Sequence, residues 1–562
     1  MVFIGGHMSA EAEPKQGGLA VCDWIVDKLE RHSGAAAALA LFLIFVIALG
    51  QSGGKLLWYD ELVTLKTASL PHWNDVWNFY DSGTDTTGPL QSFIARVGLM
   101  LPIDAELGSR LPFTFAYLVM CLCLYGYVRR RYPAGYALAS LVFMLNFATF
   151  YYATEARAYA LVLAGVGFAM FCWQSAVSGR HRLWSLIGLW LGLAFAIDAH
   201  AFAIFLFVPF ALAQFVSDFK RKKSDWAIWA ALVLFPAGIL PVLHGELIAK
   251  KTFGGSFWAQ PHLESMVDSY RIFCLRGRSY VIAVLLAGIG AALLQRHGRL
   301  HFPEPKARGF SVPEWVLAAM IALLPLYVIP ASYLLHIYDP RYVISCNMGL
   351  VILAVAAVAE VARRGRIAGV ALLALFLLGS AFSRVGTFVE GLHALAHPCH
   401  VHQQLQARFN NYPWMKLLEQ SMLPVATDDP HQYGQIDYYA KPELNQRLYA
   451  LTDIGETVKY PLSATSQLNF LRFGKQFSYR VLDVANFVPE HSHFLLAPEA
   501  PETANYGWLP HYLIAQQVAG NASFSCLGPA CASSGANVFD VQFTKIPIQT
   551  EKEAISQSIS AR

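Results

Sequence analysis

Two neighbouring carboxylates, Asp60 and Glu61, are the first candidates for chemistry in this chain. They follow the first long apolar run, residues 34–50. That run is long enough to cross a membrane, so the pair lies about one or two helical turns beyond one face of a bilayer. Acids in such a place are either solvated loop residues or part of a site. Trp58 and Tyr59, aromatic residues at interface depth, precede the pair and favour the functional interpretation.

The elements that must position these acids are membrane spans. The chain has 562 residues, of which 13% are aromatic and only 14% are charged, and its mean hydropathy is +0.40. This composition excludes an ordinary soluble globule and indicates a polytopic membrane protein. The net charge of +4 is small, and its lysines and arginines occur in short clusters between apolar runs. We interpret these clusters as topology signals, and we expect no nucleic-acid partner.

About eleven apolar runs have the length of a membrane span. They cover residues 34–50, 111–128, 135–152, 158–177, 184–197, 201–216, 226–243, 280–294, 314–335, 342–361 and 367–383. The long run at 184–216 is divided at 198–200 because basic clusters at both of its ends demand an even number of crossings. Residues 90–101 carry Arg96 and are predicted to form a helix along the membrane interface.

The basic cluster at residues 129–131 sets the predicted orientation. If it is cytoplasmic, the other basic connections between spans fall on the same side. The first span is then an uncleaved anchor, although its end also resembles a signal-peptidase site. The predicted domains are a cytoplasmic N-terminus (1–33), a membrane domain (34–384) with outer loops at 51–108 and 244–279, and an extracytoplasmic soluble domain (385–562). The last mixes helical patches such as 414–420 with strand-like ones such as 494–497, so we expect a mixed α/β fold.

With this topology the unusual polar residues gather at the outer ends of the spans. Such asymmetry predicts a site in a cavity at the outer bilayer surface, built from several loops. The candidates for substrate contacts are Tyr59, Asp85, Glu155, Arg157, Tyr159, Arg271, Arg276, Arg278, Arg341 and Tyr342.

Each of these groups also has a structural interpretation. The tyrosines around Arg157 are typical of interface anchoring beside a snorkelling arginine. Arg341 follows Asp339 and Pro340, which is also a normal helix start. The arginines of the outer loop 244–279 indicate either an anionic ligand such as a lipid-linked phosphate or attraction to anionic lipid headgroups.

Residues 397–402 form the one cluster with metal-ligand chemistry. Their spacing is compressed for a tetrahedral site, and histidine-rich linkers are common on surfaces. The nine cysteines show no metal-ribbon spacing, and only Cys526 and Cys531 look like a small closed loop. The sequence carries no P-loop, no dinucleotide-binding fingerprint in a strand–helix context and no Ser/His/Asp signature.

Taken in order, the motifs of residues 34–384 resemble the C-type-fold glycosyltransferases that use lipid-linked sugars. This group holds the protein O-mannosyltransferases, the lipid A aminoarabinose transferases and the lipopolysaccharide-core transferases. The motifs are Asp60-Glu61, Thr87-Gly88-Pro89-Leu90, Ser109-Arg110-Leu111-Pro112, the Tyr-x-x-Glu-x-Arg-x-Tyr pattern ending at Tyr159, and Pro340-Arg341-Tyr342. Many members have His-Pro-Pro-Leu where this chain has Thr87 to Leu90, so a histidine contact does not carry over there.

The resemblance implies transfer of a sugar from a polyprenyl-phosphate donor with inversion at the anomeric carbon. It makes Asp60 the base or the acid that orients the acceptor, with Glu61 in support. Glu155, Arg157 and Tyr159 would shape the sugar and phosphate pocket, and the outer-loop arginines would hold the phosphate. The cofactor stays open, because some relatives use a divalent cation and others do not. The implied location is a bacterial inner membrane, and the acceptor is a lipopolysaccharide, another glycan, a lipid or a protein of the envelope.

Two other classes of function remain. A transporter or flippase for a lipid-linked anion should carry paired charges at mid-span depth and an internal repeat of broken helices, and the sequence shows neither. A non-catalytic scaffold for envelope assembly would bind through the C-terminal domain, and changing Asp60 would then have no effect.

Overall fold

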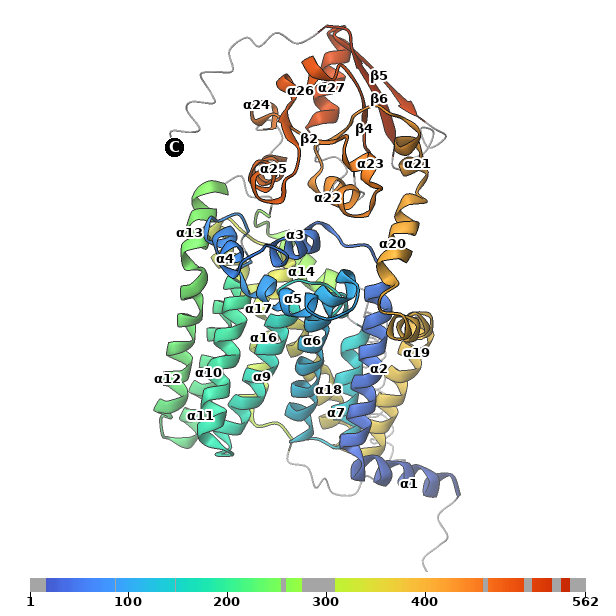
Figure 1. Cartoon of the computed structure of the whole chain (residues 1–562). Coiled ribbons are helices and arrows are strands. Elements are labelled where there is room, and N and C mark those ends of the chain that lie inside the picture. The colour runs from blue at the N-terminus through green and yellow to red at the C-terminus, as the bar shows by residue number, and fades with distance from the viewer. Residues whose placement is uncertain are drawn as a thin grey trace, which may run out of the picture.

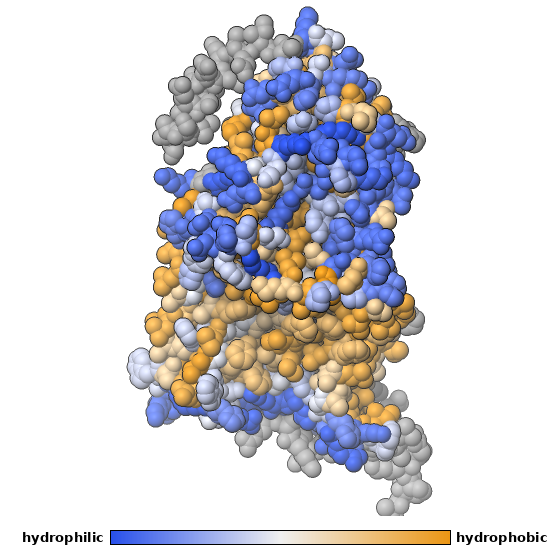
Figure 2. All heavy atoms as spheres, viewed as in Figure 1, coloured by the Kyte–Doolittle hydropathy of each residue, from blue (hydrophilic) through white to orange (hydrophobic). Residues whose placement is uncertain are grey.

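The computed structural model describes residues 17–545 except 86, 147, 254–258, 275–308, 458–462, 500–507 and 528–536. Figure 1 shows a bundle of long helices and, above it, a smaller domain in which helices surround a sheet. Three short helices lie between the two parts: α3 (Tyr59–Ala68), α4 (Trp73–Asp81) and α5 (Leu90–Leu99). Figure 2 shows an apolar band across the visible face of the bundle, with polar surfaces above and below it.

Within the described chain, six helical segments are long and apolar enough to cross a membrane. They are α2 (Ser33–Gly53), α6 (Ala105–Arg129), α9 (Tyr159–Val177), α10 (Arg182–Ala199), η2 (Ala201–Leu206) with α11 (Phe207–Arg221), and α12 (Trp226–Leu234) with η3 (Phe235–Ile239) and α13 (Leu240–Phe253). Two further candidates are bent, namely α16 (Val312–Ala322) with α17 (Leu324–Leu335), by 49°, and α19 (Arg366–Ala396), by 67°. Two shorter apolar helices are α7 (Ala134–Phe143) and α18 (Cys346–Val361). The chain is a multi-pass helical membrane protein.

The predicted division of the long apolar run is confirmed. Helix α10 ends at Ala199, and His200 then adopts an extended backbone with φ −158° and ψ 119°. Its Nδ1 accepts a hydrogen bond from the Phe202 N–H, which starts the next element. The predicted span at 280–294 lies outside the described residues, so the number of about eleven spans stays a prediction.

Several predicted spans differ in shape or length from the helices that form. The predicted span at 135–152 is one helix only as far as Phe143, and it continues as η1 (Met144–Asn146) and α8 (Thr149–Tyr152). The predicted span at 314–335 bends between α16 and α17, where Pro325 lacks the N–H that a continuous helix needs. Helix α19 runs past the predicted end of its span at 383.

The C-terminal domain is built on a six-stranded mixed sheet. Its strands are β1 (Val425–Thr427), β2 (Leu448–Thr452), β3 (Val481–Asp483), β4 (His493–Leu496), β5 (Ala522–Leu527) and β6 (Val538–Phe543), in the spatial order β3-β2-β1-β4-β6-β5. The first four are parallel, and β5 and β6 join antiparallel at one edge. The helices of this domain are α20 (Val401–Asn410), α21 (Pro413–Gln420), α22 (Pro430–Tyr439), α23 (Pro442–Asn445), α24 (Ile454–Thr457), α25 (Ser463–Phe477), α26 (Val484–Glu490) and α27 (Leu509–Val518). The expected mixed α/β fold is confirmed, including the helix near 414–420 and the strand near 494–497.

The C-terminal domain contacts α3 directly. Lys66 of α3 forms an ion pair with Asp437 of α22. Gln435 of the same helix donates a hydrogen bond to the Leu57 carbonyl at 2.9 Å. Because Asp60 lies in the first turn of α3, these contacts help to hold the helix that carries it.

Candidate active site

Asp60 and Glu61 occupy the first turn of α3, immediately after Trp58. The Glu61 carboxylate accepts a hydrogen bond from the Trp58 N–H at 3.5 Å, which closes the start of the helix. Two acids in this turn also complement the positive end of the helix dipole. Successive side chains on a helix point about 100° apart. The two acids therefore meet different surroundings.

The Asp60 carboxylate meets two arginines from distant parts of the chain. Its Oδ2 lies 3.3 Å from Arg157 Nη2 and 3.6 Å from Arg341 Nη1. Arg157 precedes α9, and Arg341 lies in η5 (Pro340–Val343). Asp85 approaches Arg157 from another side, at 3.9 Å. The Asp60 side chain is 22% exposed whereas that of Arg157 is 6% exposed, so a ligand can reach the acid in front of the arginine.

Arg341 is held between an acid and two aromatic rings. Its Nε donates to Asp339 Oδ1 at 2.8 Å, and the same oxygen accepts the Arg341 backbone N–H at 2.9 Å. The guanidinium lies 5.6 Å from the Trp58 ring and 5.7 Å from the Tyr159 ring. These contacts hold the guanidinium beside Asp60, with Nη1 3.6 Å from the carboxylate.

His200 and Tyr342 line the same region. Their rings lie 4.6 Å apart, and the Tyr159 ring lies 5.9 Å from that of His200. Burial, together with the nearby positive charges of Arg157 and Arg341, lowers the pKa of His200 to about 3. The imidazole is therefore neutral at physiological pH and adds no charge to the cluster.

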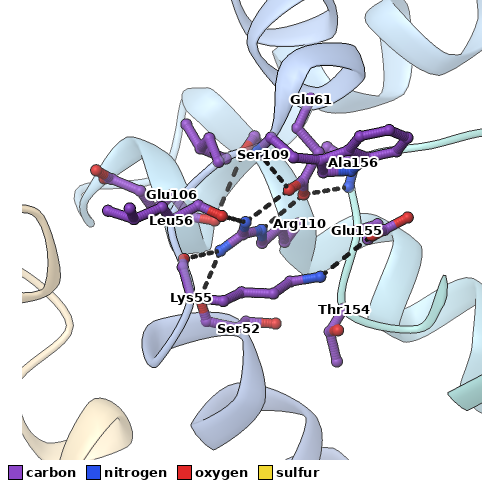
Figure 3. A network of polar contacts seen from close by, with 12 residues as sticks. Ser52, Lys55, Leu56, Glu61, Glu106, Ser109, Arg110, Thr154, Glu155 and Ala156 are labelled. Carbon is purple, nitrogen blue, oxygen red and sulfur yellow. Dashed lines mark hydrogen bonds and ion pairs between the residues drawn. The ribbon is translucent and has the colours of Figure 1, made fainter. Parts of the chain in front are cut away.

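Glu61 belongs to a second centre, which we call closed because the side chains of Glu61 and Arg110 are both fully buried (Figure 3). Arg110 of α6 donates from Nε and Nη2 to its two carboxylate oxygens, each at 2.7 Å, and neither side chain is exposed. The Ala156 N–H adds a bond of 3.0 Å. The other donors of Arg110 reach the backbone carbonyls of residues 52, 55 and 56. Burial opposes ionisation of Glu61, but Arg110 and Lys55 hold its pKa below the usual value.

Glu155 pairs with Lys55 beside this closed centre. The Lys55 Nζ lies 3.4 Å from Glu155 Oε1 and 3.9 Å from the centre of the Tyr151 ring. Burial raises the pKa of Glu155 to about 7 although Lys55 opposes the shift. Burial also lowers the pKa of Lys55.

Several buried polar atoms around these centres have no hydrogen-bond partner in the described chain. They include Arg157 Nε, Trp58 Nε1 and Glu155 Oε2. An unsatisfied buried group costs roughly 1–3 kcal/mol, so such atoms mark places where a ligand or water would bond. Two donors and one acceptor suit a ligand that carries both anionic oxygens and hydroxyl groups.

The structure brings most of the predicted site residues together, and it places others elsewhere. Tyr59 contacts the C-terminal domain, where its hydroxyl accepts a hydrogen bond from Asn469 at 3.3 Å and its ring lies 6.2 Å from Phe473. Arg271 lies on α14 (Glu264–Cys274) and is exposed, with no ion pair to the described part of the cluster. Arg276 and Arg278 lie outside the described residues.

Sequence reasoning assigned no role in the site to Lys55 or Arg110. Arg110 stands near the start of a predicted span, which signals that it needs a partner. That partner lies 49 residues earlier, so no local spacing identifies it. Among the described residues, including the histidines of 397–402, no three or more His, Cys, Asp or Glu side chains are arranged to hold a metal ion.

The chain is similar to one known protein family and to solved structures of one enzyme. A family model described as dolichyl-phosphate-mannose-protein mannosyltransferase matches residues 86–244. The chain is also similar to the crystal structure of ArnT from Cupriavidus metallidurans bound to undecaprenyl phosphate, with a TM-score of 0.51 and 12% identity over 92% of this chain and 99% of that one. The chain has the ArnT fold.

The apo state of ArnT gives the same TM-score of 0.51, with 13% identity over 93% of this chain and 98% of that one. A search of curated protein sequences gives no match. The resemblance inferred from the motifs is confirmed, since both the family match and the ArnT fold point to the same group. The matched segment contains Asn146 to Tyr159, the stretch that carries Glu155 and Arg157.

Proposed function

We propose that this protein is an inverting glycosyltransferase that moves a sugar from a polyprenyl-phosphate donor to an acceptor of the cell envelope. The observation that carries the proposal is that Arg157 and Arg341 converge on one oxygen of Asp60. The family match over residues 86–244 supports it, as does the ArnT fold, because one of the matched ArnT structures holds undecaprenyl phosphate.

Arg157 and Arg341 bind the donor phosphate in this proposal. A guanidinium matches the oxygens of a phosphate with paired hydrogen bonds. The unpartnered Nε of Arg157 supplies a further donor. Negative charge grows on the phosphate as its bond to the sugar breaks, and the two cations stabilise that charge.

Asp60 acts as the general base. When the phosphate binds the two arginines, the Asp60 carboxylate is released from its ion pairs and can accept a hydrogen bond from the acceptor hydroxyl. The acceptor hydroxyl then attacks the anomeric carbon while the bond from that carbon to the phosphate oxygen breaks. The hydroxyl proton passes to Asp60. A single displacement of this kind inverts the configuration at the anomeric carbon.

The remaining predicted residues have supporting parts. Glu61, locked to Arg110, positions the first turn of α3 and so orients Asp60. Tyr159 and Tyr342 form an aromatic wall around the sugar, Asp85 and Glu155 orient Arg157 and the pocket, and Tyr59 anchors α3 to the C-terminal domain. Arg271, Arg276 and Arg278 stay proposed contacts for the lipid-linked phosphate.

We place this site on the periplasmic face of a bacterial inner membrane. Cys526 of the C-terminal domain is disulfide-bonded, which is typical of an oxidising compartment. Helix α1 (Gly17–Arg31) ends with Lys28 and Arg31 and lies at the opposite end of the bundle (Figure 1). Basic residues beside a span are typical of the cytoplasmic side.

A transfer assay with the full-length protein in liposomes tests the proposal. The donors are radiolabelled sugars on undecaprenyl phosphate, and the acceptors are lipid, glycan and protein extracts of bacterial envelopes. We expect transfer by the natural protein, loss of transfer in Asp60→Asn, and retention in Asp81→Asn. Asp81 is an exposed acid of α4 that pairs with His244, so it is a matched control.

Two results would count against the proposal. An Asp60→Asn protein that transfers at the natural rate would contradict the site. Movement of labelled donor across the membrane without transfer to any extract would identify the transporter alternative instead.

A further inference from the structure

A groove in the membrane part of the protein lies between α2, α7 and α19. It is an open groove with a volume of about 210 Å³. Ile44 and Ile47 of α2, Val142 of α7, and Leu377 and Phe388 of α19 line it. None of the lining residues belongs to the Asp60 cluster, so the groove is a separate feature.

Arg384 is the charged residue of this groove. It follows the 67° bend of α19. Its guanidinium donates to Gln51 Oε1 at 3.3 Å and to the Leu145 carbonyl at 3.0 Å, and it lies 4.9 Å from the centre of the Phe150 ring. Gln51 is one helical turn beyond Ile47 toward the outer end of α2. The groove is thus apolar along the span and carries a cation at its outer end.

We propose that this groove binds one anionic phospholipid of the surrounding bilayer. An acyl chain fills the apolar part, and the phosphodiester accepts hydrogen bonds from Arg384. The apolar lining excludes a water-soluble ligand, because burying its polar groups there would be costly. A phosphodiester carries a single negative charge, which one guanidinium matches. A zwitterionic headgroup would bring an ammonium group close to Arg384, so the anionic lipid is preferred.

The bound lipid also supports the site, a consequence that rests on the proposed function. Arg384 contacts Leu145 and Phe150, which belong to η1 and α8. The chain runs directly from α8 into the loop that carries Glu155 and Arg157. A phosphate on Arg384 would hold the guanidinium in place and thereby stabilise this segment. Transfer is therefore expected to be faster in membranes that contain anionic phospholipid.

Photolabelling of the full-length protein in nanodiscs tests the binding claim. The nanodiscs contain phosphatidylcholine doped with a phosphatidylglycerol that carries a diazirine near the end of one acyl chain. We expect labelled peptides from α2 and α19. Ala381→Trp fills the groove, and Arg384→Gln removes its charge. Each variant should lower labelling by about tenfold. This is the loss expected when a charge-assisted hydrogen bond to the phosphate, or the space for the acyl chain, is removed.

Leu378→Trp is the matched control, because Leu378 is 62% exposed on the same helix and does not line the groove. Its labelling should stay within about twofold of the natural protein, well below the tenfold change that 1.4 kcal/mol produces. Ala40→Trp fills the same space from α2 and replaces Ala381→Trp if that variant does not fold.

Three results would overturn the assignment. Equal labelling of the groove-filling variants would show that no chain enters the groove. Equal labelling by a phosphatidylcholine probe would show that Arg384 selects no headgroup. Displacement of the label by undecaprenyl phosphate would show that the groove holds the donor chain. Intact labelling without transfer in any lipid would support the groove and contradict only the proposed function.

Discussion

The two carboxylate centres of α3 differ although their acids are adjacent in the chain. Glu61 is fully buried and makes two bonds of 2.7 Å to Arg110. Asp60 is 22% exposed and lies 3.3 Å and 3.6 Å from Arg157 and Arg341. The side chains of Glu61 and Arg110 have matched all of their donors and acceptors. Asp60, in contrast, keeps longer contacts to its arginines, and the Nε of Arg157 has no partner in the described chain.

This difference separates positioning from chemistry. A short, buried, two-bond pair loses several kcal/mol when either partner changes, so it cannot exchange partners during a reaction. A looser and more exposed pair can give its arginines to an incoming phosphate at little cost. Glu61 is therefore expected to contribute to stability and Asp60 to turnover. Variants of each residue test this assignment.

The largest expected effect is on transfer by Asp60→Asn. Loss of a general base lowers the rate by about 10²- to 10⁴-fold. The thermal unfolding midpoint should stay close to that of the natural protein, because the Asp60 side chain is partly exposed. Rate measurement and thermal unfolding of the same preparation check both parts. A protein that unfolds early but transfers normally once folded would reverse the roles of the two acids.

The next effect is on the stability of Glu61→Gln. Removing one partner of a buried ion pair costs about 3–5 kcal/mol because the other charge is left unpaired. Thermal unfolding in detergent measures this loss. The double variant Glu61→Met with Arg110→Met should recover much of it, since both charges are then absent. A stable Glu61→Gln protein without transfer would show instead that Glu61 takes part in the chemistry.

A smaller effect is expected for Arg157→Lys and Arg341→Lys. Lysine keeps the charge but loses the planar fork, which removes about 1.5–3 kcal/mol of hydrogen bonding and raises the KM for the donor by about 10- to 100-fold. Arg96→Lys is the control, because Arg96 of α5 binds the carbonyls of Leu70 and Pro71 away from the cluster. An equal change in KM for all three variants would remove the special role of the Asp60 centre.

The smallest expected effect concerns Glu155, which makes the free energy of unfolding depend on pH. Its folded-state pKa is raised to about 7, above the ordinary value near 4.3 of an unfolded chain. The protonated acid is thus favoured on folding, so this contribution is present below about pH 4.3 and is lost as the pH rises through about 7. Glu155→Gln should therefore gain thermal stability relative to the natural protein between pH 5 and pH 8. A constant difference across that range would contradict the shift.

Much of the architecture could be predicted because it depends on local properties. The length of an apolar run indicates a span, and the basic clusters indicate its direction. The break at His200 followed from the same reasoning and is confirmed. The bend of α19 could not be predicted, because the helix continues through it without a proline. The assignment of Asp60, Arg157 and Arg341 to one site stays a prediction that their proximity supports.

A multi-pass membrane protein with a mixed α/β domain and polar residues at one end of its spans could be predicted from the amino-acid sequence. Hydrophobic length and charge placement suffice for that, because they act over about twenty residues. Which acid of the pair is buried and which is accessible depends on the packing of distant helices. One step along a helix turns a side chain by about 100°. The packing of distant segments then sets the partner of each acid. Glu61 meets Arg110 from α6, and Asp60 meets Arg157 and Arg341 from two later segments.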